Sequence, residues 1–200
     1  MDIFIWQITG SVYNAGLQEN YNINVDDLAI LSLVFSISMI IFQIPAGKLT
    51  HKIGIKKSLI FCVSFGLIIF PLNIITWITW SLGNTSLLIP LLVLCQIFWG
   101  ATASTFIPSE LSMMTDLGES RKGENFGIVH AVRGIGGIPT GVLGGFLIEY
   151  IHFLAPFIIT TIGVTIEIWY IIKFGENLKK TEEKTSISTK QEFELSEISP

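Results

Sequence analysis

Two ionisable residues, Arg133 and Glu167, interrupt stretches of sequence that are otherwise apolar enough to lie in a membrane. A charge at that depth is costly, so such residues are retained for a function or to neutralise one another. At about 1.5 Å per helical residue, Arg133 lies about 10 Å from the beginning of its stretch and Glu167 about 8 Å from the end of its stretch. The two stretches are consecutive and would run antiparallel, so both depths are measured from the same side of the membrane. The similar depths predict an ion pair. Either this pair only joins two helices, or Arg133 faces a cavity and attracts an anion or exchanges partners.

Uncharged polar residues also lie inside the apolar stretches, and their chemistry is hydrogen bonding. They are Gln7, Tyr13, Asn14, Gln43, Asn73, Gln96 and His130. Single amides and hydroxyls in membrane helices more often bond a neighbouring helix than a ligand. Histidine is the side chain that most often carries protons at physiological pH, so His130 could serve proton coupling, although a packed, hydrogen-bonded histidine is the commoner case.

The residue patterns of enzymes and of nucleic-acid-binding proteins are absent from the sequence. No glycine loop followed by Lys and Ser or Thr marks a nucleotide site, no His and Cys cluster marks a metal site, and no nucleophile elbow is present. We therefore expect no catalytic residue, no metal and no cofactor. A net charge of -4 and a pI near 5.3 argue against nucleic acid as a partner.

Long hydrophobic helices must position these residues. Charged residues make up 14% of the 200 residues, against about 25% in soluble domains, and the mean hydropathy is +0.62. About 20 apolar residues span the hydrocarbon of a bilayer. The stretches that reach this length are 28–47, 58–80, 87–107, 126–148 and 151–172. A sixth stretch, 3–17, reaches about 22 Å of a ~30 Å core, so we predict a short first span.

The basic residues predict how these spans are oriented. Every Lys and Arg except Arg133 lies in the connections 48–57 and 121–122 or follows the last span. By the positive-inside rule this side is cytoplasmic, which puts both termini of a multi-pass plasma-membrane protein in the cytoplasm. Residues 175–200 mix Lys, Glu, Ser and Thr, and they are predicted to form a disordered cytoplasmic tail after a bundle over 1–174.

The connection at 47–57 has the most specific spacing in the chain. It reads Gly-Lys-Leu-Thr-His-Lys-Ile-Gly-Ile-Lys-Lys, and its glycines permit a tight turn between two helices. Its lysines suit the anionic headgroups of the inner leaflet, so membrane lipid is an expected partner. The residues that define the pattern are Gly47, Leu49, His51, Lys52, Gly54, Lys56 and Lys57. In the plainer interpretation it is only a basic cytoplasmic turn.

This spacing, between the second and third predicted spans, resembles the signature loop of the major facilitator superfamily. The connection at 109–125, followed by Phe126, Gly127 and a glycine-rich span, is similar to that family's loop between its fourth and fifth helices. His51 departs from the pattern, because the family has an aspartate there that takes part in charge contacts at the cytoplasmic gate. Gly141 stands where the family's antiporter motif has a proline, so no antiporter subclass is assigned.

The glycines of the fifth predicted span favour close helix packing. Gly137, Gly141 and Gly145 recur every four residues, and small residues at this spacing let neighbouring helices approach closely. Pro139 removes one backbone hydrogen bond from the same helix and invites a kink. Packing is therefore the expected role of these glycines, ahead of solute contact.

The resemblance implies an all-α, polytopic transmembrane bundle of six spans, the first one short, that forms half of a major-facilitator-type fold. Family members join two six-helix halves around a solute site, and the short first span and charged tail favour the C-terminal half. The resemblance also implies that the first, fourth and fifth helices line the cavity. The polar and aromatic candidates on them are Gln7, Asn14, Gln96, Trp99, His130 and Arg133.

The function that the resemblance implies is the transport of a small solute by alternating access, coupled to an ion or a proton. Because one half cannot enclose the solute alone, a second half is an expected partner, as another copy of the chain or as a separate chain. Two other functions stay open. One is a non-transporting assembly or regulatory protein descended from a transporter, and the other is a membrane-embedded enzyme.

Overall fold

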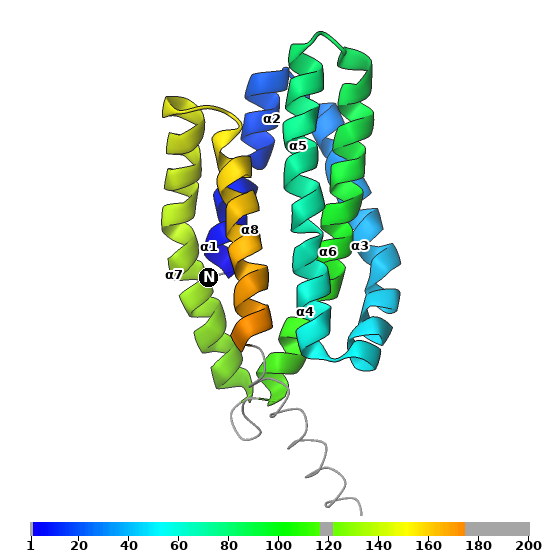
Figure 1. The fold of residues 1–200 in the computed structure, drawn as a ribbon, viewed down its shortest axis with the longest axis vertical. Coiled ribbons are helices and arrows are strands. Elements are labelled where there is room, and N and C mark those ends of the chain that lie inside the picture. Colours follow the sequence, from blue (N-terminus) through cyan, green and yellow to red (C-terminus); the bar gives the residue numbers. More distant parts are fainter. Residues whose placement is uncertain (1, 117–121, 175–200) are drawn as a thin grey trace, which may run out of the picture.

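The chain folds as an elongated bundle of helices in the computed structural model, which describes residues 2–116 and 122–174 (Figure 1). The helices are α1 (Asp2–Gly10), α2 (Tyr13–Tyr21), α3 (Val25–Ile53), α4 (Ile55–Ser64), α5 (Gly66–Ser81), the 3-10 turn η1 (Thr85–Leu87), α6 (Leu88–Asp116), α7 (Lys122–Tyr150) and α8 (Ala155–Phe174). Neither described range contains a β-strand. The tail predicted over 175–200 lies outside the described residues.

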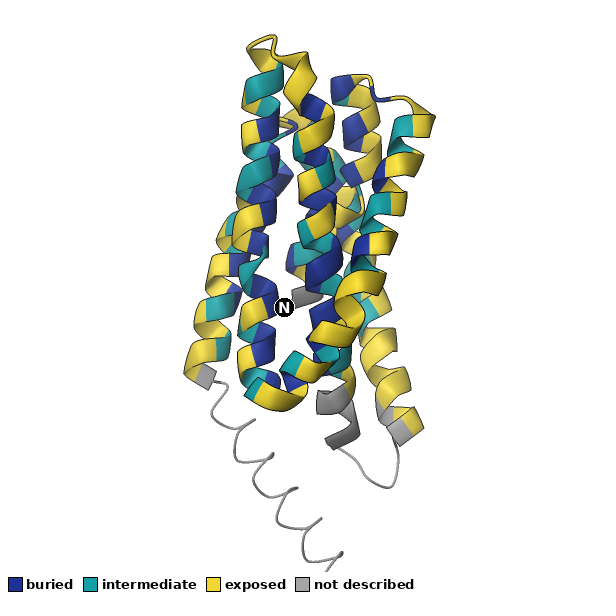
Figure 2. Cartoon of the chain, turned by 90° about the vertical axis from the view of Figure 1, so that its right-hand side faces the viewer, coloured by how far each residue is buried: buried dark blue, intermediate teal, exposed yellow. Residues whose placement is uncertain are grey.

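Five helical units of the described chain are long and apolar enough to cross a membrane. They are α3, α4 with α5, η1 with α6, α7 and α8, and they match the five long stretches found in the sequence. The prediction of an all-α bundle with several membrane spans is therefore confirmed. Large apolar side chains such as Ile44 and Ile138, 70% and 73% exposed, cover the outside of the bundle. Figure 2 shows these exposed faces on the outside and the buried faces turned inward.

The short first span is two helices rather than the single one that the sequence suggests. α1 ends at Gly10, and α2 begins at Tyr13 and continues to Tyr21, beyond the expected end at Leu17. At the break, the hydroxyl of Ser11 donates to the Gln7 carbonyl at 2.6 Å. Figure 1 shows α1 starting part-way along the bundle and α2 continuing toward the end where α5 and α6 are joined. The number of consecutive apolar residues indicates only the first part of the segment that α1 and α2 form, because α2 is mostly polar.

Helix α6 extends further than the sequence suggests. Its apolar stretch ends at Ile107, just before Pro108, yet the helix continues to Asp116. A proline removes one backbone hydrogen bond, and helices in a membrane bundle tolerate this where neighbouring groups compensate. As a result Ser109 and Glu110, expected in a connection, are helical.

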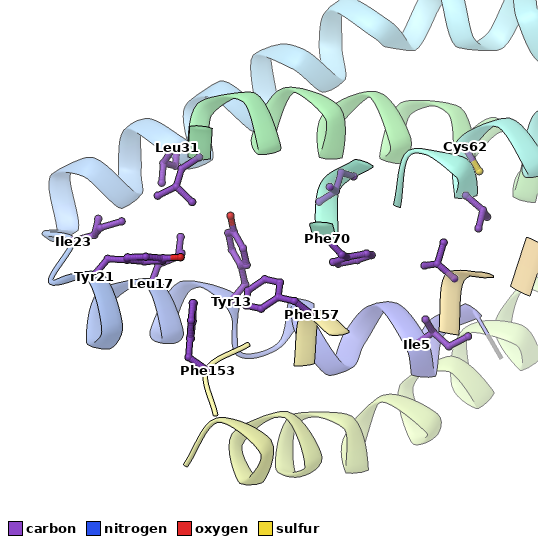
Figure 3. Packing of buried hydrophobic residues seen from close by; sticks show 14 of the residues in the cluster. Ile5, Tyr13, Leu17, Tyr21, Ile23, Leu31, Cys62, Phe70, Phe153 and Phe157 are labelled. Carbon is purple, nitrogen blue, oxygen red and sulfur yellow. The ribbon is translucent and has the colours of Figure 1, made fainter. Parts of the chain in front are cut away.

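An aromatic core joins α2, α5, α6 and α8. The hydroxyl of Tyr13 donates to the Asn73 side-chain oxygen at 3.2 Å. The Tyr13 ring meets Trp99 and Phe157 edge-on, at centroid distances of 5.0 and 6.2 Å. Figure 3 shows Tyr13 beside Phe157, with Phe70 next to them in the core. Edge-to-face ring pairs of this kind add specificity to apolar packing, so these helices hold fixed relative positions.

Glycines bring α7 against α1 and α6 against α3. A Cβ added at Gly144 would overlap the Ile8 carbonyl oxygen, and one at Gly137 would overlap the side-chain oxygen of Gln7. A Cβ at Gly100 would lie 2.7 Å from the carbonyl oxygen of Phe35. At Gly144 and Gly100 the neighbouring atom is backbone, so these contacts need a residue without a side chain, whereas at Gly137 the Gln7 amide can move aside.

Of the three glycines predicted to form the packing face of α7, one does not lie on it. Gly137 and Gly141 lie toward α1, but Gly145 faces open space and Gly144 makes the close contact instead. With 3.6 residues per turn, positions spaced four and then three apart stay on one face, whereas two steps of four drift off it.

Replacing Gly144 by Ala is expected to lower the free energy of unfolding by about 1–3 kcal/mol, because the new Cβ meets backbone that cannot move aside easily. The matched control is Gly145→Ala, which adds the same methyl group in open space. That change is expected to be neutral or to stabilise the helix by about 0.5–1 kcal/mol. Thermal unfolding of the two purified variants measures the difference, and equal stabilities would contradict the close approach of α7 to α1.

Candidate functional site

An ion pair joins α6 and α7. Arg133 Nη2 lies 2.6 Å from Glu110 Oε1, and Arg133 Nη1 donates to Glu110 Oε2 at 2.9 Å. Both side chains are mostly buried, at 21% and 14% exposure. The guanidinium carbon also lies 5.5 Å from the ring centroid of Phe106, one helical turn before Glu110. Two parallel charge-assisted bonds fix the position and the plane of the guanidinium.

The structure gives Arg133 a different acidic partner from the predicted Glu167. The carboxylate of Glu167 is buried and accepts the indole N–H of Trp6 at 3.3 Å, which links α8 to α1. Counting residues along a helix gives the depth of a side chain but not the direction in which it points. Glu110 was missed because the sequence analysis ended its span at Ile107. Its position four residues after Phe106, on the same helix face, was the available signal.

A cavity of about 250 Å³ lies beside this ion pair. Three predicted cavity residues line it: Gln7 from α1, Trp99 from α6 and Arg133 from α7. Trp6 and Phe106 add two more aromatic walls, and Cys62, Val63, Thr102 and Ala103 complete the lining. This cavity is thus mostly apolar and aromatic, with a guanidinium at its edge.

A second cavity of about 250 Å³ lies between α2, α3 and α6. It contains the predicted residues Asn14 and Gln96 and shares Trp99 with the first cavity. Ser32 and Ser36 also line it, and the sequence analysis missed them. The hydroxyl of each serine donates to the carbonyl four residues earlier, at 2.9 Å in both cases. The two serines are themselves four residues apart, and this spacing places them on one face of α3.

His130 is the one predicted cavity residue that lines neither of these two cavities. It is exposed on α7, and its ring lies 4.3 Å from that of Phe126 between centroids. A single polar residue in an apolar stretch does not reveal which face of the helix it occupies.

The predicted signature loop is almost entirely helical. Gly54 alone separates α3 from α4, with φ 82° and ψ 162°, a conformation that is open essentially only to glycine. Lys56 donates to the Ile172 carbonyl at 3.1 Å, near the carboxyl end of α8. A cation at that end of a helix is favourable. Of the other predicted residues, Gly47 and Leu49 are half-buried, and His51, Lys52 and Lys57 are exposed.

Three buried hydroxyls join the helices above this turn. The Ser58 hydroxyl lies 2.8 Å from that of Thr50 and 2.8 Å from that of Ser109, and Thr50 and Ser109 are 3.3 Å apart. The cluster ties α3, α4 and α6 together at one end of the bundle.

The sequence profile of the Major Facilitator Superfamily matches residues 1–198. The chain belongs to this superfamily. It is therefore a multi-pass membrane protein of a transporter family.

Curated relatives of this facilitator chain include the quinolone resistance protein NorA of Staphylococcus aureus. NorA of strains Mu50 and N315 is 28% identical over 156 residues, and NorA of strain MRSA252 is 27% identical. The aligned segment covers 78% of this chain and 38% of the relative, so the chain spans well under half of the proteins it matches. No solved structure gives a significant match.

Neutralising Arg133 alone is expected to destabilise this facilitator chain, because a mostly buried Glu110 would lose its ion-pair partner. We expect Arg133→Gln to lower the free energy of unfolding by about 1–3 kcal/mol, less than for a fully buried pair. The double variant Arg133→Gln with Glu110→Gln should recover most of that loss, since two amides can bond each other. Thermal unfolding in detergent measures both, and additive losses in the double variant would contradict the coupling.

Proposed function

We propose that the chain forms one half of a transporter that moves a small solute by alternating access. The observation that carries this proposal is a row of exposed polar residues on α1, on α2 and in the turn between them: Gln7, Ser11, Asn14 and Gln18. They are spaced four, three and four residues apart along α1 and α2. Lipid cannot satisfy polar groups of this kind, so their face is expected to border water or another protein.

The two cavities support the same proposal. Gln7 belongs to the first cavity and Asn14 to the second, so both cavities meet the polar row. Ser32 and Ser36 extend the polar surface onto α3, and both are exposed. A second six-helix half placed over this face would enclose the cavities. Rocking of the two halves would then open the enclosed site to each side of the membrane in turn.

The second half is proposed to be another copy of the chain, a separate chain, or the rest of a longer chain. The short share of NorA that aligns with this chain favours a missing half. We further propose that the basic end of the bundle, where α3 meets α4 and α8 ends, faces the cytoplasm of a plasma membrane. The described end of α8 would then lie on the cytoplasmic side, whereas α1 begins part-way along the bundle (Figure 1).

The solute is proposed to be a small organic molecule that contains a ring. The NorA relatives are named for resistance to quinolones, and aromatic side chains dominate the first cavity. Coupling to a proton or another ion would use the ionisable groups at membrane depth. Among the described residues they include Glu110, Arg133 and Glu167.

Water should reach the polar row but not the outer apolar face of the bundle. In intact membranes, Asn14→Cys is expected to react with a water-soluble maleimide, and the control Ile138→Cys is expected not to react. The native Cys62 and Cys95 are buried and should contribute little labelling. Labelling of both introduced cysteines to the same extent would contradict a water-lined face on α2.

Transport is tested directly by flux into liposomes. The chain is reconstituted at a density that lets two copies meet, and also fused to a second facilitator half. A panel of labelled organic anions, cations and neutral compounds is offered under a proton gradient. Accumulation of at least one compound is expected. No flux of any compound in either preparation would overturn the proposal and favour a non-transporting membrane protein.

A further inference from the structure

The first cavity has few polar lining groups. Arg133 is its only charged lining residue among those described, and the uncharged polar ones are Gln7 and Thr102. The large side chains that line the cavity besides Arg133 are the rings of Trp6, Trp99 and Phe106. A solute that fills this cavity must therefore present ring surface to most of it and one polar group to the guanidinium.

The aromatic walls are held in place by contacts outside the cavity. The indole N–H of Trp6 bonds the Glu167 carboxylate, and the Trp6 ring packs on Phe70 at a centroid distance of 5.2 Å. Trp99 meets Tyr13 at 5.0 Å, with the two ring planes 71° apart. Rigid rings lose little conformational entropy on binding, so these walls are prepared for a flat, ring-shaped partner.

The guanidinium of Arg133 already binds a carboxylate of the chain. Both terminal nitrogens of the Arg133 guanidinium contact the carboxylate of Glu110, which itself does not line the cavity. A planar carboxylate is the partner that a guanidinium fork binds most specifically. A carboxylate entering from the cavity would therefore compete with Glu110 for the same nitrogens.

We infer that the first cavity binds a one- or two-ring aromatic solute with a single carboxylate, which exchanges with Glu110 on Arg133. This inference names the solute class of the proposed transporter, and it rests on that proposed function. A volume of about 250 Å³ accommodates a small ring system. A cation is disfavoured because the charged group that reaches the cavity is itself cationic.

The first experiment compares three ligands on the unmodified chain in lipid nanodiscs by calorimetry. The ligands share a naphthalene ring and differ in charge: 2-naphthoate, 2-naphthalenemethanol and 2-naphthylmethylammonium. The carboxylate is expected to bind about tenfold more tightly than either of the others, because its bonds to the guanidinium are partly offset by the release of Glu110. Equal affinities, or tighter binding of the ammonium compound, would overturn the inference.

The second experiment separates competition from a merely structural role of the ion pair. Arg133→Gln should weaken naphthoate binding about 10- to 100-fold. Glu110→Gln should strengthen it about tenfold, because the internal competitor is gone while the guanidinium remains. A structural role alone would instead weaken binding in both variants, and that result would overturn the inference.

The matched control is Glu149→Gln, which neutralises an exposed carboxylate near the other end of α7 and should leave naphthoate affinity unchanged. Thermal unfolding is recorded for every variant. If Glu110→Gln fails to fold, the ligand comparison on the unmodified chain still decides the inference.

Failure of this inference and failure of the transport proposal give different results. A chain that transports cations or neutral compounds but shows no preference for naphthoate overturns the solute class alone. A chain that binds naphthoate with the expected preference but moves no compound in liposomes keeps the binding site and overturns transport.

Discussion

A polar atom held away from water must find its partner within the protein, and most of this bundle follows from that constraint. Hydroxyls on the helices donate to carbonyls four residues earlier, as Ser64 does at 2.6 Å and Thr161 at 2.7 Å. Where a side chain reaches across, it joins two helices, as the Thr9 and Thr160 hydroxyls do at 2.7 Å. The ion pair of Arg133 with Glu110 satisfies two charged groups in the same way, and it links α7 to α6.

The sequence predicts the features of this fold that depend on composition along one helix. Apolar length identifies the five long spans, and a run of glycines identifies α7 as a close-packing helix. It does not predict features that depend on direction around a helix. Three findings are of this second kind. Arg133 pairs with Glu110, His130 is exposed, and Gly144 rather than Gly145 makes the close contact with α1.

Helix ends are the other feature that apolar counting misses. The break before Tyr13 and the continuation of α6 past Pro108 depend on local hydrogen bonding and on neighbouring helices rather than on hydropathy. The continuation of α6 matters most, because it moves Glu110 from an expected connection to a helix face beside the first cavity. A signature loop and its position were enough to identify the superfamily, but the ion pair beside the cavity required coordinates.

The break between α1 and α2 has a mechanical consequence. Trp6 and Gln7 on α1 line the first cavity, whereas Gly10 at the end of α1 and Tyr13 and Asn14 on α2 line the second. An unbroken helix behaves as a rod and transmits a tilt at one end to the other. At Ser11 and Val12 the backbone N–H groups still bond the carbonyls of Gln7 and Thr9, but the second bond spans three residues instead of four, so the helix axis changes between the walls of the two cavities.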